Sequence, residues 1–181
     1  MKQPAGTLGA LALVLTLAVG DLHAQDRSFA FGLGGGATFP LGEIADEFDA
    51  GLHINALMQS GSLGSLPFGL RGEVGYQTFS HDDDTLRHIV GRLNAVLPFA
   101  RRADAQPYLI AGVGLYNSKE ETDHGDHTHG GEAENFFGLN AGVGIRWTLA
   151  GLNTFVEARF HNVFDDHHTQ RFIPFSLGIL F

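Results

Sequence analysis

Apolar residues recur at every second position along most of the chain after residue 24. In the final segment, five apolar side chains share one parity: Ile173, Phe175, Leu177, Ile179 and Phe181. A period of two indicates β-strands whose two faces meet different surroundings. Seven earlier segments repeat the pattern, separated by turn-forming residues. We therefore expect eight strands, which lie within residues 29–36, 52–59, 68–77, 88–97, 109–116, 138–147, 156–161 and 172–181.

The face opposite the apolar one carries the charges of these segments, and much of the rest of it is Gly or Asn. A soluble sheet points its apolar face inward and its charges to water. Opposite charges with little side-chain bulk instead suit the narrow interior of a small barrel. We expect ion pairs in that interior among Arg71, Glu73, Arg92, Arg146, Glu157 and Arg159.

The apolar face of the predicted sheet would then meet lipid. Because lipid offers no hydrogen bonds to backbone groups, the sheet must close on itself. Each segment runs for about 9–13 residues, near the roughly 9–11 that cross a bilayer as a tilted strand. The predicted fold is therefore all-β, an eight-stranded antiparallel up-and-down transmembrane β-barrel. The side chains expected to point outward include Phe29, Leu109, Val143, Phe160 and Phe175.

The connections between the segments alternate in length. The even-numbered ones are short: 61–66, 100–106 and 150–153. The odd-numbered ones include the longest and collect acidic and His residues: 41–50, 81–84, 120–135 and 165–170. In outer-membrane barrels the long loops are extracellular, and an even number of strands puts both termini on the other side. We therefore expect periplasmic termini and acidic outer loops.

The N-terminal 24 residues are typical of a cleaved signal peptide. Lys2 supplies the positive charge, residues 8–19 the apolar region, and Leu22-His23-Ala24 a cleavage site of the small-residue kind. The apolar run has about a dozen residues, fewer than the roughly 20 that span a bilayer as a helix. We expect signal peptide over 1–24 and a barrel domain over 25–181; a retained N-terminal anchor is the alternative.

Charge and cysteine content exclude several classes of function. The net charge of −9 argues against a nucleic-acid partner, because phosphate backbones bind basic surfaces. The absence of Cys excludes a disulfide scaffold, a thiolate zinc site and a lipid-anchored N-terminal cysteine.

With these features the chain resembles the small outer-membrane β-barrel family, the OmpA/OmpX-like eight-stranded porin-fold proteins of Gram-negative bacteria. The resemblance is carried by PFGLRGEVGYQTF (67–79), PYLIAGVGLY (107–116), FGLNAGVGIRW (137–147), FVEARFH (155–161) and PFSLGILF (174–181). It implies an outer-membrane location. It also implies that the barrel-assembly machinery reads the chain end, where Phe175, Leu177, Ile179 and Phe181 match the family's alternating apolar signature. The family does not fix one function.

We interpret the protein as a non-enzymatic barrel with a structural or surface-interaction role, acting without a cofactor. One alternative is a soluble exported lipocalin-like ligand-binding barrel, which would need an apolar interior. Another is a lipid-A-modifying barrel enzyme. Glu157, Arg159 and His161 invite that interpretation, but they share the inward parity, and the lipid substrate of such enzymes lies outside.

The third outer loop is a candidate site for a divalent cation. It holds His124, His127 and His129 among Asp123 and Asp126. Imidazole suits Zn²⁺, Cu²⁺ or Ni²⁺, and loop carboxylates suit Ca²⁺ or Mg²⁺. The spacing matches no closed zinc motif, so a solvated surface loop is the alternative.

Three cations are expected at the outer rim on the lipid-facing parity: Arg87, Lys119 and Arg171. Charge costs only about 0–1 kcal/mol on that face near the interface. There the cations would meet the phosphates of lipopolysaccharide, which accept charge-assisted hydrogen bonds. Side chains that merely snorkel to water are the alternative. The expected partners are thus outer-membrane lipid, lipopolysaccharide and the barrel-assembly machinery.

Overall fold

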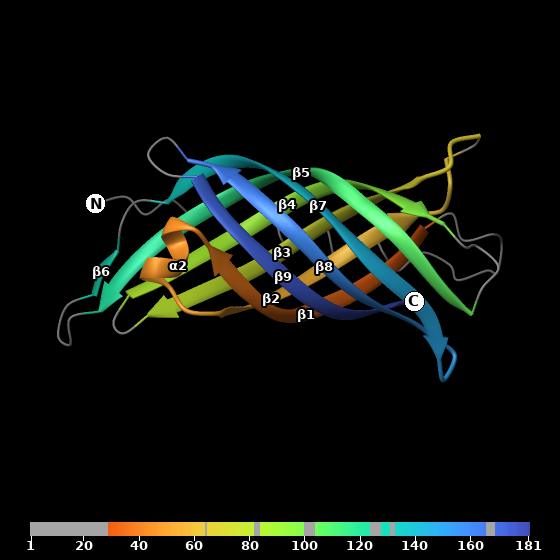
Figure 1. The fold of residues 1–181 in the computed structure, drawn as a ribbon, viewed down its shortest axis with the longest axis horizontal. Helices are drawn as coiled ribbons and strands as arrows, with labels where there is room; N and C mark the ends of the chain where they lie inside the picture. The colour runs from red at the N-terminus through yellow and green to blue at the C-terminus, as the bar shows by residue number, and fades with distance from the viewer. Residues whose placement is uncertain are drawn as a thin grey trace, which may run out of the picture.

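The computed structural model describes residues 29–63, 65–81, 84–99, 104–123, 128–130, 133–165 and 169–181, and in them the chain forms a closed β-barrel (Figure 1). The eight barrel strands are β1 (Phe29–Leu41), β2 (Gly51–Ser60), β3 (Gly69–His81), β4 (Asp84–Pro98), β5 (Ala105–Asp123), β7 (Glu134–Leu149), β8 (Leu152–Phe164) and β9 (Thr169–Leu180). A three-residue strand, β6 (Thr128–Gly130), pairs antiparallel with the last residues of β5, and a short helix, α2 (Glu43–Glu47), follows β1.

Each barrel strand pairs antiparallel with its neighbour in the order β4-β3-β2-β1-β9-β8-β7-β5, and the β4–β5 pairing closes the ring. The first and last strands meet where Phe31 N donates to Phe181 O at 3.0 Å and Phe181 N to Phe31 O at 2.8 Å. The prediction of an eight-stranded up-and-down barrel is confirmed. The strands run from 10 to 19 residues, and the longest exceed the predicted span.

The alternation of side chains around the wall follows the predicted parity. The five residues expected to point outward are 42–58% exposed. Their sequence neighbours face the lumen and are mostly buried. No helix in the described parts of the chain is long and apolar enough to cross a bilayer.

The two ends of the barrel differ. At the right of Figure 1 are the start of β1, the C-terminus and the tight β7–β8 turn, and we call this the short-turn end. In that turn Ala150 and Gly151 have φ of 51° and 83°, the two positive values of a type I′ hairpin. The opposite end carries α2 and β6, and we call it the loop end.

Buried apolar clusters lie towards both ends of the lumen. At the loop end Ile44 and Phe48, from α2 and its C-terminus, join a buried cluster with Phe79, Leu86 and Phe172. Nearer the short-turn end two further clusters are buried, one around Phe155 and one around Tyr108. The sequence interpretation expected ion pairs to fill the interior, and it did not anticipate these apolar layers on either side of them.

Candidate functional site

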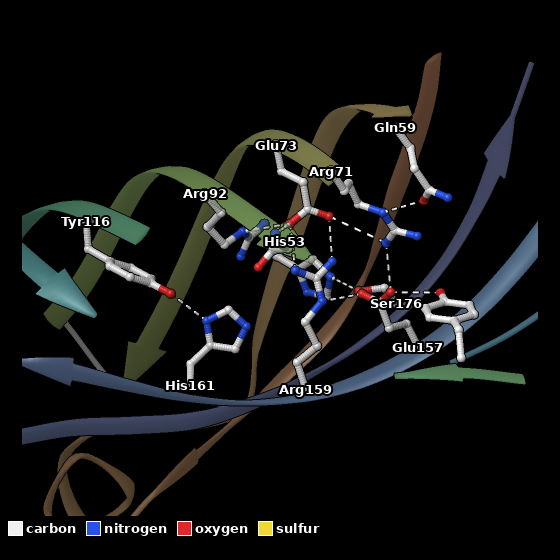
Figure 2. Close-up of polar contacts among 12 residues, drawn as sticks. His53, Gln59, Arg71, Glu73, Arg92, Tyr116, Glu157, Arg159, His161 and Ser176 are labelled. Carbon is white, nitrogen blue, oxygen red and sulfur yellow. Dashed lines mark hydrogen bonds and ion pairs between the residues drawn. The ribbon is translucent and has the colours of Figure 1, made fainter. Parts of the chain in front are cut away.

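The charged centre of the lumen joins opposite walls of the barrel. Arg71 and Glu73 come from β3, Arg92 from β4, and Glu157 and Arg159 from β8. Three strands separate β3 from β8 in either direction around the ring. The inward parity points these side chains at one another across a narrow lumen, as Figure 2 shows.

Glu73 is the centre of this network. Its Oε2 accepts hydrogen bonds from Arg159 Nη1 at 2.6 Å and Asn94 Nδ2 at 3.2 Å. Its Oε1 accepts one from Arg159 Nη2 at 2.5 Å, so the Arg159 guanidinium holds both carboxylate oxygens. Arg92, its cross-strand neighbour, lies with Nε 3.1 Å from Oε2. Arg71 Nη1 is 3.7 Å from Oε1.

Glu157 forms the second carboxylate of the network. Its Oε2 accepts from Arg71 Nη1 and from the Tyr108 hydroxyl, both at 2.7 Å, and its Oε1 accepts from Arg159 Nε. Arg71 in turn donates through Nε to Gln59 Oε1 at 2.8 Å. The Arg71 guanidinium also lies 5.3 Å from the centre of the Phe155 ring.

Water has little access to this network. Arg71 and Glu157 are each 1% exposed, and Glu73 and Arg159 each 4%. Buried charges persist only when they are paired and hydrogen-bonded. The ion pairs therefore act together with the apolar layers as a plug that joins β3 to β8.

Arg146 lies apart from the five residues that the structure brings together. It is half-buried on β7, and its Nη2 donates to Gln106 Oε1 at 3.1 Å. The Tyr108 ring lies over Gly144 of the same strand as Arg146, where a Cβ atom would collide with the ring. The Tyr108 hydroxyl donates a hydrogen bond to Glu157. Only glycine leaves room for the ring there. Among the described residues, Arg146 has no carboxylate within ion-pair distance.

Several polar residues of the lumen were not singled out from the sequence. They are Gln59, Asn94 and Tyr108 in the network, and Thr38, Ser176 and Tyr116, which bond to histidines. All have the inward parity, and that signal could have found them. His53 links the Thr38 hydroxyl at 2.9 Å to the Ser176 hydroxyl at 2.8 Å.

The trio of Glu157, Arg159 and His161 is enclosed by the lumen. His161 is fully buried, its Nδ1 lies 2.6 Å from the Tyr116 hydroxyl, and its ring stacks on Phe172 at 5.0 Å. None of these groups reaches the outer wall. The arrangement supports an interior packing role for the three side chains.

The rim cations lie at two separate places. Arg87 and Lys119 are direct cross-strand partners on β4 and β5 at the loop end. Arg171, on β9, is separated from β5 by β7 and β8, and its Nε donates to Asn162 Oδ1 at 3.2 Å. One phosphate could therefore contact Arg87 and Lys119 together but not all three.

The remaining sequence-predicted sites fall partly outside the described residues. The signal peptide (1–24), His124, Asp126 and His127 lie outside them, as do the side chains of Asp123 and His129. In the rest of the structure no three His, Asp or Glu side chains are placed to hold a metal ion. The chain-end residues Phe175, Leu177, Ile179 and Phe181 point outward from β9 or just beyond it.

Comparison with known proteins identifies the fold. No protein-family model matches the chain, and no curated protein sequence matches it. Among solved structures it is similar to Neisserial surface protein A (NspA), with 14% identity, a TM-score of 0.59 and coverage of 84% of this chain and 96% of that one. It is similar to a major outer membrane protein from Thermus thermophilus, with 16% identity, a TM-score of 0.59 and coverage of 86% and 99%. It also resembles Ail, the attachment invasion locus protein of Yersinia pestis, with 11% identity, a TM-score of 0.53 and coverage of 84% and 97%. The chain thus has the fold of the small eight-stranded outer-membrane β-barrels.

Proposed function

We propose that the protein is a non-enzymatic integral barrel of a Gram-negative outer membrane, with a structural or surface-interaction role. One observation carries the proposal: the wall is apolar outside, while its interior is charged and filled. Exposed Leu, Val, Ile and Phe side chains surround the wall, and the buried ion pairs occupy the centre. An inverted distribution of this kind is stable in lipid and unfavourable in water.

The two alternative functions fit the structure less well. A lipocalin-like carrier needs an apolar cavity in the lumen, whereas here the centre holds a packed ionic network and the described pockets inside the barrel lie towards its two ends. A lipid-A-modifying enzyme needs catalytic groups that reach lipid. The histidine and carboxylate that invited that interpretation are enclosed with the plug.

Cell fractionation together with a heat-modifiability gel tests the proposed location and fold. We expect the expressed protein in the outer-membrane fraction, and we expect its unboiled form to migrate differently in SDS because closed barrels resist unfolding until they are heated. Recovery in the osmotic-shock fluid, with no mobility difference on boiling, would favour the soluble carrier.

We also propose that the rim cations Arg87, Lys119 and Arg171 contact lipopolysaccharide, with Arg87 and Lys119 sharing one phosphate. Their adjacency on β4 and β5 supports a shared contact. Loss of one charge-assisted hydrogen bond, about 1.5 kcal/mol, corresponds to roughly tenfold weaker binding. The double variant Arg87→Gln, Lys119→Gln should therefore co-purify with much less lipopolysaccharide than the parent. Its loss of lipopolysaccharide should exceed that of Arg171→Gln alone. If the variant with all three cations replaced by Gln retains as much lipopolysaccharide as the parent, the three side chains only snorkel to water.

Two further partners follow from the sequence. The barrel-assembly machinery is proposed to read the outward-facing chain end at Phe181. Slower outer-membrane insertion on deletion of that residue would test this proposal.

The His-rich loop is proposed to bind a divalent cation weakly. Titration with Zn²⁺ while following the signals of His124, His127 and His129 would test that site, and absence of binding below millimolar metal would leave a solvated loop.

A further inference from the structure

The interior of the barrel carries more positive than negative charge. Among the residues that the structure describes, four arginines face it, Arg71, Arg92, Arg146 and Arg159, against two carboxylates, Glu73 and Glu157. The two carboxylates are fully engaged by three of these arginines. Of the two surplus positive charges, one remains within the network and the other is Arg146, the arginine nearest the short-turn end.

Arg146 lines a pocket of about 360 Å³ that opens at this end of the barrel. Gln59, Ser60, Ser62 and Gln106 provide other polar groups of its lining, and no Asp or Glu is among the described residues that line it. Asp104, near the start of the neighbouring strand, is exposed and does not line it. A cleft lined by one sign of charge and walled by protein concentrates counter-ions of the opposite sign.

The ion-pair network orients a second donor toward this pocket. The Gln59 Oε1 atom accepts from Arg71 Nε at 2.8 Å, so the Gln59 amide must present its NH₂ group on the other side. In Figure 2 the Gln59 amide nitrogen points away from the network. Arg146 uses its Nη2 toward Gln106 and keeps other guanidinium N–H groups for a ligand. Donors of both residues thus line one pocket, and no carboxylate is among its described lining residues.

The geometry points to a binding site for a small organic carboxylate in this pocket, held by Arg146 and Gln59. A guanidinium fork matches the two oxygens of a carboxylate, and the contact would offset one of the two surplus charges of the lumen. The volume is larger than a single ion requires, and Ala30, Val96 and Pro98 offer an apolar wall to the carbon part of a ligand. In the proposed orientation the pocket faces the periplasm, so the carboxylate would come from a free small acid or from the end of a peptide.

The experiment is an NMR titration of the folded barrel in detergent micelles. Sodium acetate, N-acetylglycine or sodium phosphate replaces sodium chloride at constant ionic strength, while the Arg146 Nε and Gln59 Nε2 signals are followed. We expect saturable shifts of both signals with acetate and N-acetylglycine. If N-acetylglycine binds more tightly than acetate, the carboxylate comes from the end of a peptide. If the two bind with equal affinity, it comes from a free acid.

Matched variants separate this site from general charge effects. Arg146→Gln should weaken binding at least tenfold, and Arg146→Lys, which keeps the charge but loses the fork, should weaken it less. Arg171→Gln removes the same charge at the loop end and should leave binding unchanged. Non-saturating shifts with both carboxylates in the parent protein, or saturation by phosphate alone, would overturn the assignment. The signals of the parent protein test carboxylate binding even where a variant folds poorly. This result does not depend on the proposed cellular location.

Discussion

Replacing Glu73 with glutamine is expected to lower the free energy of unfolding by about 3–5 kcal/mol, the usual cost of breaking a buried ion pair. Gln keeps nearly the same shape but removes the charge that Arg92 and Arg159 share. Three buried arginines would then face the single carboxylate of Glu157. Denaturant unfolding of the barrel in lipid vesicles, followed by Trp147 fluorescence, measures the change.

Glu47→Gln provides the control for this prediction. Glu47 lies exposed on α2, so the same chemical change there should alter the free energy of unfolding by less than about 0.5 kcal/mol. Equal midpoints for the two variants would show that the lumen is wet enough to screen its charges. The plug would then have no part in holding β3 to β8.

Gly142→Ala is the second change with a large expected effect. Gly142 faces the lumen on β7 opposite Arg159. A Cβ atom there would collide with the Ala158 carbonyl oxygen, and it would lie 2.7 Å from Arg159 Cα and 2.8 Å from Arg159 Cγ. Because two of these atoms are backbone, the β7–β8 pairing must shift and carry Arg159 with it. We expect a loss of about 1–3 kcal/mol, typical of overpacking.

Gly91→Ala is the matched variant on the outer face. No heavy atom lies within 4 Å of a Cβ atom at Gly91. Alanine there should leave stability unchanged or raise it by up to about 1 kcal/mol, through the reduced freedom of the unfolded chain. The same unfolding measurement compares the two variants. Similar losses at both positions would mean that glycine is needed for strand curvature rather than for space inside the lumen.

The alternation of residue types along the chain was sufficient to predict the strands, their two faces and the set of inward charges. Each of these follows from a period of two, which alternate Cβ directions impose on any strand. On β8 the parity that puts Phe160 outside puts Glu157 and Arg159 inside without reference to their partners. Closure followed because an apolar outer face in lipid cannot leave a sheet edge open.

Which inward residues contact one another depends on how the strands are arranged around the barrel. Ring order and register place β3 opposite β8, so Glu73 meets Arg159, which is 86 positions away in the sequence. They also place the Tyr108 ring over Gly144, from where its hydroxyl donates to Glu157. The apolar clusters of the lumen could not be predicted from the sequence either. Phe79 and Phe172 have the inward parity, but their cluster with Ile44 and Phe48 forms only when α2 packs against the end of the barrel. Parity assigns a side chain to a face, while its partner depends on height along the barrel axis and on the strand across the lumen.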